Sequence, residues 1–588
     1  MAQFGLSGYT ALGIGSYTPN LVDSQNRQLI TDFTWMRDKH SFKYGINVSW
    51  LQGYLFNPQQ ALGVFSFDGS FTRNSATLKE GDAAADFLLG LPYQAQTSNY
   101  VHMNQRAPFY HFYAQDQWRA TRKLTLNFGL RYQLNLPWIE KKDGWANFDI
   151  DADPGNPRLV LATPGSRASR ATIATDANDF APRLGFAYRA TEQTVVRGGY
   201  GVYYTQYEAF GGGQYLETNP PFHYKAQLST DRVNPTLPLV DGIPPGTVTP
   251  RNARNIATSS YDRKLRSGYA QQWSFSVQRE LPGDMLFEIG YYANTAHKLM
   301  RRLDGNYALP GPGNINARRR YKTILVPRDE VVVGPLAQCF RHEASGNSNF
   351  HSMQMRMEKR LSHGLSFLAS YMWSKTISDS RGESGAGGTA PGYPQDPLNK
   401  RAERSPADEH RAHRLVVSHV YDLPFGRGKS YLGGLHPLLD GLLGGWSIAG
   451  ITTLHGGRRV NLSVRGNPSN SGNPDRPNVL HDWRLGRSER SLDRWFDTTA
   501  FAPNRQYEFG NAGRNLLEGP GTVNFDFAVY KYFRIAEGKR LQFRAEAFNL
   551  TNTPAFGIPN AQVGDKDFGE IGGAGRPRNL QFGLKFIF

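Results

Sequence analysis

The feature that most constrains this sequence is an alternation of apolar and polar residues, which persists through runs of roughly 9 to 13 residues. In residues 123–134 (KLTLNFGLRYQL), every even position is Leu, Phe or Tyr, and the odd positions from 125 onward are Thr, Asn, Gly, Arg and Gln. Period two is the side-chain period of a β-strand. Strands of soluble domains are usually about 5–6 residues long, whereas a strand that crosses a bilayer needs about 9–11. The same alternation recurs in residues 41–50, 521–529 and 540–547, and around Trp273, Ile289, Met355 and Phe367.

The connections between these runs alternate between short and long. Tight turns are predicted at residues 38–40, 120–122, 190–193, 281–284, 362–364 and 536–538. Long segments rich in Gly, Pro and Asn follow at residues 137–181, 206–267, 298–349, 379–409, 458–521 and 552–576. Loops longer than about 15 residues are uncommon in compact soluble domains, but short turns on one side and long loops on the other are typical of outer-membrane barrels. The pattern therefore predicts an all-β fold, a transmembrane antiparallel β-barrel, with a soluble many-stranded β-protein as the alternative.

The composition excludes several other classes. The 588 residues have a mean hydropathy of −0.53, which argues against a helical membrane protein. The least polar long window, residues 435–451, contains His436, Asp440 and several glycines, so it is not a spanning helix. The single cysteine, Cys339, excludes an intramolecular disulfide framework and cysteine-based zinc or iron–sulfur sites. Aromatic residues make up 13%, more than a disordered chain carries.

The charge is basic, but it is scattered. Sixty-seven Lys and Arg against 50 Asp and Glu give a net charge of +17. The arginines lie in predicted loops, for example residues 318–320 and 484–494, and on the polar faces of predicted strands. This distribution favours solvated or lipopolysaccharide-facing charge over a nucleic-acid site, and we expect no nucleic-acid partner.

No motif for catalysis, a cofactor or a metal stands in a matching context. His410 and His413 lie beside Asp408 and Glu409, but positions three apart on a strand point to opposite faces. The glycines of GGYGVYY, from Gly198, lie inside a β-run and not before a helix, as a phosphate loop would require. We expect no enzyme activity, no cofactor and no metal. Five tryptophans near predicted strand ends are interpreted as an interfacial girdle and not as core residues: Trp118, Trp138, Trp273, Trp373 and Trp446.

Five long stretches, in collinear order, resemble TonB-dependent receptors, and specifically their large Oar-like subfamily. They are residues 112–132 (FYAQDQWRATRKLTLNFGLRY), 180–204 (beginning FAPRLGFAYRA), 269–297 (YAQQWSFSVQRELPGDMLFEIGYYANTAH), 349–379 (NFHSMQMRMEKRLSHGLSFLASYMWSKTISD) and 541–557 (LQFRAEAFNLTNTPAFG). The resemblance covers residues from about Leu29 to Phe588, and it implies a barrel in a Gram-negative outer membrane. It also implies energy-coupled import of a large or scarce solute, in which the TonB complex acts on a plug inside the barrel. The sequence departs from the family in front of the first predicted strand, where it shows no signal peptide, TonB box or plug.

The last predicted strand has a distinct pattern. Its alternating face resembles the carboxyl-terminal signal that outer-membrane barrels present to the barrel assembly machinery. That face consists of Leu580, Phe582, Leu584, Phe586 and Phe588.

From these observations we expect residues 1–588 to form one outer-membrane barrel, with residues 1–27 as an irregular lead-in or outer loop. About fifteen strands are clear, and up to two more fall between Leu62 and Met103. Because bacterial barrels have an even number of strands, we expect an N-terminally truncated barrel without its plug and first strands.

For function, we expect outer loops that capture an unknown solute, and a luminal path lined by polar groups. Strand parity selects the luminal candidates Arg131, Arg197, Arg544 and Glu546. Two alternatives remain: a structural or adhesive surface barrel without transport activity, and a secreted β-rich carbohydrate-active enzyme, which would need paired carboxylates across a cleft.

Overall fold

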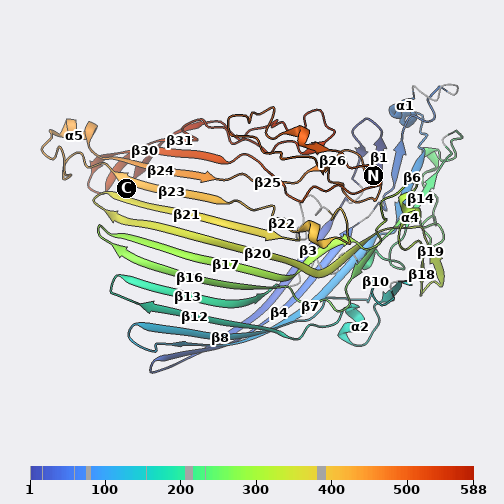
Figure 1. Cartoon of the computed structure of the whole chain (residues 1–588), viewed down its shortest axis with the longest axis horizontal. Helices are drawn as coiled ribbons and strands as arrows, with labels where there is room; N and C mark the ends of the chain where they lie inside the picture. Colours follow the sequence, from blue (N-terminus) through green and yellow to red (C-terminus); the bar gives the residue numbers. More distant parts are fainter. Residues whose placement is uncertain are drawn as a thin grey trace.

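The computed structural model describes residues 2–15, 18–57, 60–74, 81–153, 155–205, 216–231, 233–380 and 393–588. A single curved sheet of 18 strands forms a wall, and loops with small sheets and short helices gather at one end of it (Figure 1). Three of the 18 strands are short additions, β9 (Ile139–Glu140), β15 (Ile256–Tyr261) and β22 (Ser405–Pro406). The other fifteen form an antiparallel meander, as the alternation predicts: β3 (Leu21–Arg37), β4 (His40–Asn57), β7 (Val101–Trp118), β8 (Leu124–Asn135), β12 (Asp179–Arg189), β13 (Thr194–Tyr204), β16 (Tyr269–Leu281), β17 (Met285–Asp304), β20 (Leu336–Ser362), β21 (Leu365–Ser378), β23 (His413–Asp422), β24 (Trp446–His455), β30 (Thr522–Ala536), β31 (Lys539–Phe548) and β33 (Asn579–Ile587).

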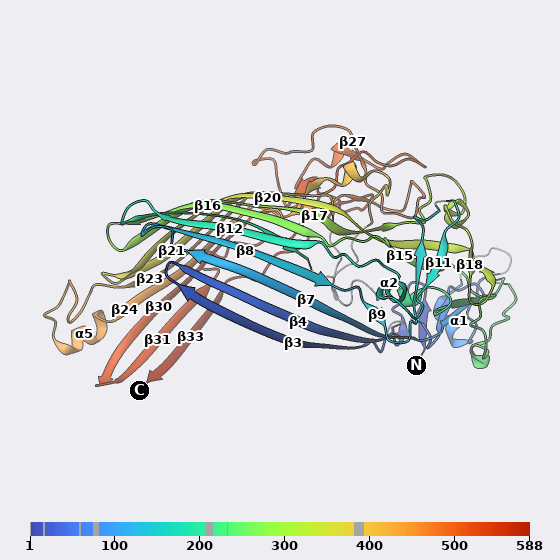
Figure 2. The ribbon, with the colours of Figure 1, turned by 90° about the horizontal axis from the view of Figure 1, so that it is seen from below.

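The two edges of this wall are β3 and β33. β3 pairs with β4, and β33 pairs with β31. Figure 2 shows them as the separate margins of the curved sheet. All 17 residues of β3 are exposed, which is expected of a strand with one free edge. Both edge strands run from the loop end to the turn end, where the chain also reaches its C-terminus. Across the described residues, the sheet is therefore an open wall.

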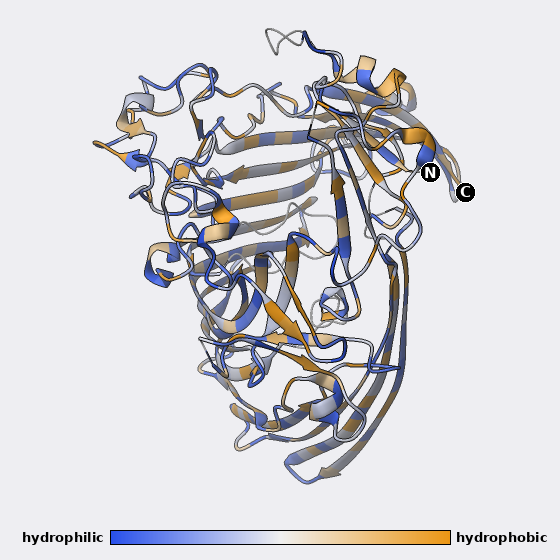
Figure 3. Ribbon diagram, turned by 90° about the vertical axis from the view of Figure 1, so that its right-hand side faces the viewer, coloured by the Kyte–Doolittle hydropathy of each residue, from blue (hydrophilic) through white to orange (hydrophobic). Residues whose placement is uncertain are grey.

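The register divides the wall into two faces. Directly paired residues of an antiparallel ladder point to the same side, so each face can be followed from strand to strand. Arg131, for example, pairs with Tyr113 and Ala181, and Arg197 pairs with Ala187 and Ser276. The alternation of hydrophilic and hydrophobic residues along the strands is visible in Figure 3.

The opposite face carries large apolar side chains that no part of the described chain covers. Phe582 is 69% exposed and Leu584 is 68% exposed. Such a contiguous apolar surface is expected where the surroundings are lipid. Its exposed members include Leu29, Phe33, Trp35, Tyr44, Ile46, Trp50, Phe112, Phe128, Leu130, Phe180, Leu184, Tyr188, Phe275, Tyr291, Trp373, Val523 and Phe533.

The buried apolar core lies mainly in the loops. One cluster forms around Phe148, Tyr321 and Leu336, and another around Leu462 and Phe496. Two smaller clusters complete the set. The loop segments therefore pack into a folded cap. Its short elements are β1 (Gln3–Leu6), β2 (Leu12–Gly13), β5 (Val64–Phe67), β6 (Gln94–Ser98), β10 (Ala146–Asp149), β11 (Arg158–Leu161), β14 (Lys225–Ser229), β18 (Ile324–Val326), β19 (Val331–Val333), β25 (Arg459–Val460), β26 (Ser463–Val464), β27 (Asn478–Val479), β28 (Phe501–Ala502), β29 (Leu517–Glu518), β32 (Gln562–Val563), α1 (Ala83–Leu88), α2 (Arg167–Ala171), α4 (Ile315–Arg318), η1 (Leu216–Thr218), η2 (Leu239–Asp241), η3 (Lys400–Glu403) and η4 (Thr498–Ala500).

Three expectations about the elements need correction. Residues 1–27 are not an irregular lead-in throughout: β1 and β2 join a small sheet, and β3 begins at Leu21. Residues 21–28 (LVDSQNRQ) have no clear apolar alternation, yet their backbone pairs with β4. In the described residues between Leu62 and the start of β7 there is no wall strand, because β5 and β6 have only four and five residues and belong to the small sheet of β1. Trp138 is 4% exposed within an apolar cluster of the loops, so it is not a girdle residue.

The alternation of short turns and long loops has one exception. Between β23 and β24, residues 423–445 form a long connection at the turn end, and it contains α5 (Pro437–Leu443) (Figure 1). Proline and glycine lie near both ends of this segment, and its leucines do not follow the period of two that is typical of the wall strands.

No helix in the described part of the chain is both long enough and apolar enough to span a bilayer.

Candidate functional site: the luminal wall

The polar face of the wall holds the four residues that strand parity selects. Arg131 lies on β8, where its guanidinium is 2.7 Å from Nδ1 of His111. Arg197 lies on β13, opposite Ser276. Arg544 and Glu546 lie two residues apart on β31.

The structure brings Arg544 and Glu546 together through one tyrosine. The guanidinium of Arg544 lies 5.7 Å from the ring centroid of Tyr530, and its Nε donates to Gln542 at 2.9 Å. The Tyr530 hydroxyl donates to Glu546 at 3.5 Å. Arg131 and Arg197 stand several strands away across the sheet. The four residues therefore line one face but do not form one cluster.

One hollow of this face extends from β20 to β31. It has a volume of about 700 Å³, and Glu546 is among its lining residues. Arg356, Glu358 and Asp526 also line it, and Arg356 forms an ion pair with Glu358 at 2.8 Å. These three residues were not among the candidates predicted from sequence. The alternation in QMRMEK, residues 354–359, carries the same parity information and would have identified Arg356 and Glu358.

Two further hollows continue along the same face. One of about 540 Å³ shares Arg356 with the first and is also lined by Glu288, Tyr292 and Arg414. The next, of about 400 Å³, shares Tyr292 and reaches Arg183 and Tyr203. The guanidinium of Arg183 lies 4.7 Å from the centroid of the Tyr203 ring. The shared residues make the three hollows neighbours in a polar surface that runs along the wall.

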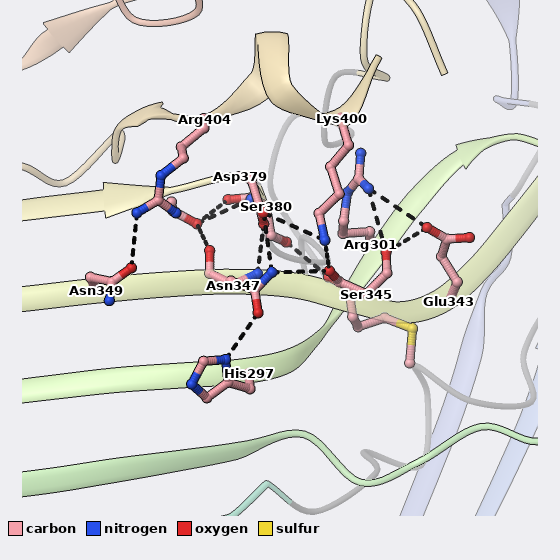
Figure 4. Close-up of polar contacts among 12 residues, drawn as sticks. His297, Arg301, Glu343, Ser345, Asn347, Asn349, Asp379, Ser380, Lys400 and Arg404 are labelled. Carbon is pink, nitrogen blue, oxygen red and sulfur yellow. Dashed lines mark hydrogen bonds and ion pairs between the residues drawn. The ribbon is translucent and has the colours of Figure 1, made fainter. Parts of the chain in front are cut away.

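A polar cluster at the loop end fastens the segment that follows β21 (Figure 4). Asp379 is 7% exposed and accepts hydrogen bonds from the backbone N–H of Asn347 at 2.6 Å and from its Nδ2 at 3.3 Å. Nζ of Lys400 lies 3.6 Å from the same carboxylate and also donates to the Ser345 carbonyl. Arg404 donates to Asn349 at 3.2 Å. Both ends of this segment, at 379 and at 400–404, are therefore attached to β20.

The arrangement is suited to non-covalent contact with a polar solute. Among the described residues, no group of three or more His, Cys, Asp or Glu could hold a metal ion. His410 and His413 have separate partners: Nδ1 of His410 accepts from the backbone of Thr376, and Nδ1 of His413 lies 2.8 Å from the Tyr371 hydroxyl. Gly199 and Gly201 lie inside β13, so no phosphate loop forms there.

A wall of membrane-length strands with one apolar face and one polar face defines the class: a transmembrane β-barrel protein. Residues 1–581 match the family model described as "Outer membrane beta barrel domain". The chain therefore belongs to this family, and its location is the outer membrane. The match confirms the β-barrel fold class and the location predicted from the sequence, whereas the N-terminal truncation and the Oar-like subfamily stay predictions.

Solved structures with a similar arrangement are outer-membrane transporters and receptors. The transporter YddB from Escherichia coli is 10% identical with a TM-score of 0.49, over 97% of this chain and 54% of that one. The ferripyoverdine receptor of Pseudomonas aeruginosa is 11% identical with a TM-score of 0.44, over 96% and 48%. The FrpB iron transporter from Neisseria meningitidis is 12% identical with a TM-score of 0.43, over 96% and 55%. The chain thus spans about half the length of these proteins. No curated protein matches it.

Proposed function

We propose that this chain is the barrel wall of an energy-coupled importer that takes up a large or scarce solute across the outer membrane. The observation that carries the proposal is the row of three neighbouring hollows along the luminal wall. Eight-stranded barrels are filled by their own side chains, whereas barrels of about 16 strands or more leave an aqueous channel or hold a plug. The fifteen strands of this wall support a lumen of the wide kind.

The charges on the wall indicate how it would treat a solute. Arg356, Arg414 and Arg544 lie on the same face as Glu288 and Glu546, so the surface offers both donors and acceptors. Such a surface supports transient contacts along a path better than one tight site. In this proposal the loop cap captures the solute, and Arg131, Arg197, Arg544 and Glu546 belong to the path.

The resemblance to TonB-dependent receptors supports the energy source. In this proposal a plug in the lumen connects the barrel to the TonB complex, lipopolysaccharide surrounds the outer rim, and the barrel assembly machinery inserts the wall. The wall itself performs no bond chemistry, so we propose a non-enzymatic role.

Uptake by living cells tests the proposal. Strains with the gene, without it, and complemented with it would receive mixed ferric siderophores, copper, oligosaccharides and peptides, and mass spectrometry would follow their loss from the medium. We expect at least one solute whose uptake disappears on deletion and also on addition of a protonophore. Uptake that resists the protonophore would show a passive channel, and no solute difference would favour a structural or adhesive barrel. Either result would overturn energy-coupled import.

Luminal variants test the path. Once the solute is known, the double variant Arg356→Gln/Glu546→Gln should reduce its uptake at equal protein level, because both residues line the hollow of about 700 Å³. The matched control is Met357→Leu, which changes the other neighbour of Arg356, on the opposite face of β20 and outside the three hollows. Equal uptake by the double variant and the control would show that this hollow is not part of the solute path.

A further inference from the structure

The connection at residues 423–445 is unusual because it places apolar residues in the open at the turn end. Four leucines of α5 are exposed: Leu438 by 80%, Leu439 by 49%, Leu442 by 64% and Leu443 by 44%. In a helix, positions i, i+1, i+4 and i+5 lie on one side, so these four leucines form a single apolar face. Nothing in the described chain covers it.

The C-terminal end of α5 is fastened to the apolar side of the wall. Lys531 of β30 pairs with Trp446 on one side and with Phe543 on the other, so it lies on the apolar face of the sheet. Its side chain is only 2% exposed. Nζ of Lys531 donates to the carbonyls of Gly444 and Leu442, the latter at 3.3 Å, and Trp446 Nε1 donates to the Leu442 carbonyl at 2.9 Å.

These contacts explain how an ammonium group can lie on a lipid-facing surface. The last carbonyls of a helix have no partner within the helix, and they attract a cation. Lys531 supplies that cation, and Nζ also lies 5.2 Å from the centroid of the Trp446 ring. The helix end and the lysine satisfy each other, and this holds α5 beside the apolar band.

The exposed charged residues of the segment are basic. Its acidic residue, Asp440, is engaged within the segment, where it accepts from the backbone N–H of Arg427 at 2.7 Å. Arg427 and Lys429 are exposed. An apolar helix face accompanied by exposed basic residues is the pattern of an element that lies in the plane of a membrane interface and binds anionic lipid.

We propose that residues 423–445 form an interfacial anchor that inserts the leucine face of α5 into the phospholipid leaflet at the turn end of the barrel. Short turns of outer-membrane barrels face the periplasm, so this is the inner leaflet of the outer membrane. Two observations favour lipid as the occupant: α5 is attached to the apolar band that lipid already covers, and the free charges beside it are basic. The proposal does not depend on what the barrel transports.

Fluorescence quenching by lipid tests the anchor directly. The full-length protein would be placed, one copy per disc, in nanodiscs of phosphatidylethanolamine and phosphatidylglycerol with brominated acyl chains. A bimane label would be attached to the cysteine introduced by Leu442→Cys. The native Cys339 is fully buried, so it does not compete for the label. Phe582→Cys, in the apolar band, is the positive control. Val240→Cys is the matched negative control, since Val240 is an apolar loop residue that is 91% exposed. We expect quenching at 442 close to that at 582 and well above that at 240.

A second variant tests the attachment. Lys531→Met should lower the quenching at position 442, because it removes the group that holds the end of α5. Lys359→Met, at another turn-end lysine that bonds the Gly283 carbonyl, should leave it unchanged. Quenching at 442 no greater than at 240 would overturn the proposal. A second outcome would also overturn the proposal: position 442 is not quenched by brominated lipid in the disc, but its cysteine is protected from thiol reagents in cells. That outcome would assign the leucine face to a protein partner.

Discussion

Glu217 is a carboxylic acid buried in the loop cap, beside Leu216 of an apolar cluster. Burial raises the pKa of Glu217 well above its usual value, and nearby Glu140 raises it further. In the unfolded chain the carboxyl group of Glu217 ionises above about pH 4.3. Because the pKa is higher in the folded cap, the folded cap binds this proton more tightly than the unfolded chain does. The stability of the cap is therefore greatest below that pH and falls as pH rises toward the folded pKa.

Glu217→Gln should remove this dependence and stabilise the cap near pH 8. Hydrogen exchange of residues 216–224, measured at pH 6 and pH 8, would report the change. Glu508→Gln, at an exposed position of the loops, is the control. Exchange at pH 8 that is equal in Glu217→Gln and the unaltered protein would contradict the burial of an ionisable group at this site.

Removal of Phe588 tests whether the apolar face of the last strand is recognised during barrel assembly. It is 90% exposed and its ring stacks on Phe586 at 5.9 Å. Burying one such side chain in lipid contributes roughly 1.5–3 kcal/mol, which a large barrel tolerates. If the terminal face is recognised during assembly, removing Phe588 should lower outer-membrane levels far more than Phe128→Ala, a comparable loss on the apolar face. Immunoblots of outer-membrane fractions measure this, and similar levels would make Phe588 one more lipid-facing residue.

Parity gave the face of individual side chains correctly, but it could not identify which of them meet. Arg131, Arg197, Arg544 and Glu546 all lie on the polar face, because their strands are regular. The hollow beside Glu546 is also lined by Arg356 of β20 and Asp526 of β30. Their meeting depends on the register between strands far apart in sequence, and alternation along one strand does not contain that information.

Among the elements, the attachment of the segment after β21 depends on Asp379. Asp379→Ala removes the buried carboxylate that accepts from Asn347 and attracts the Lys400 ammonium, and a hydrogen bond to a charged group contributes about 1.5–3 kcal/mol. We expect faster cleavage within residues 393–404 when protease is added to intact cells. Asp396→Ala is the control, since Asp396 accepts a local bond from the Leu398 backbone. Equal cleavage of the two variants would show that the cluster in Figure 4 does not hold the segment.

The wall strands and tight turns were predictable, because period two persists over membrane length in them. The loop cap was not. Its strands, such as β14 and β26, have only five and two residues, too few to establish a period, and they pair with β6 and β32 from other loops. α5 was not predicted, because it has only seven residues. Its C-terminal end is held by contacts with Lys531 of β30 and Trp446 of β24, which its own sequence does not indicate.

For the molecule as a whole, the direction of the edges limits how the wall can close. β3 and β33 run the same way, so they cannot pair directly as antiparallel neighbours, and bacterial barrels are antiparallel with an even number of strands. Closure of the fifteen-stranded wall therefore takes an odd number of further strands between these edges. In the double variant Leu29→Cys/Leu584→Cys, an oxidant that joins only adjacent thiols should produce no disulfide in the assembled membrane protein. Efficient disulfide formation would place β3 beside β33 and contradict this inference.

The wall has one face in water and one in lipid, and transport through the lumen depends on this division. A cysteine scan along residues 523–528 of β30, treated with a charged, water-soluble thiol reagent in isolated outer membranes, measures it residue by residue. Asn524, Asp526 and Ala528 should react, whereas Val523, Phe525 and Phe527 should not, because their side chains lie on the apolar face. Uniform reactivity, or reaction in the opposite phase, would contradict the assignment of the lumen.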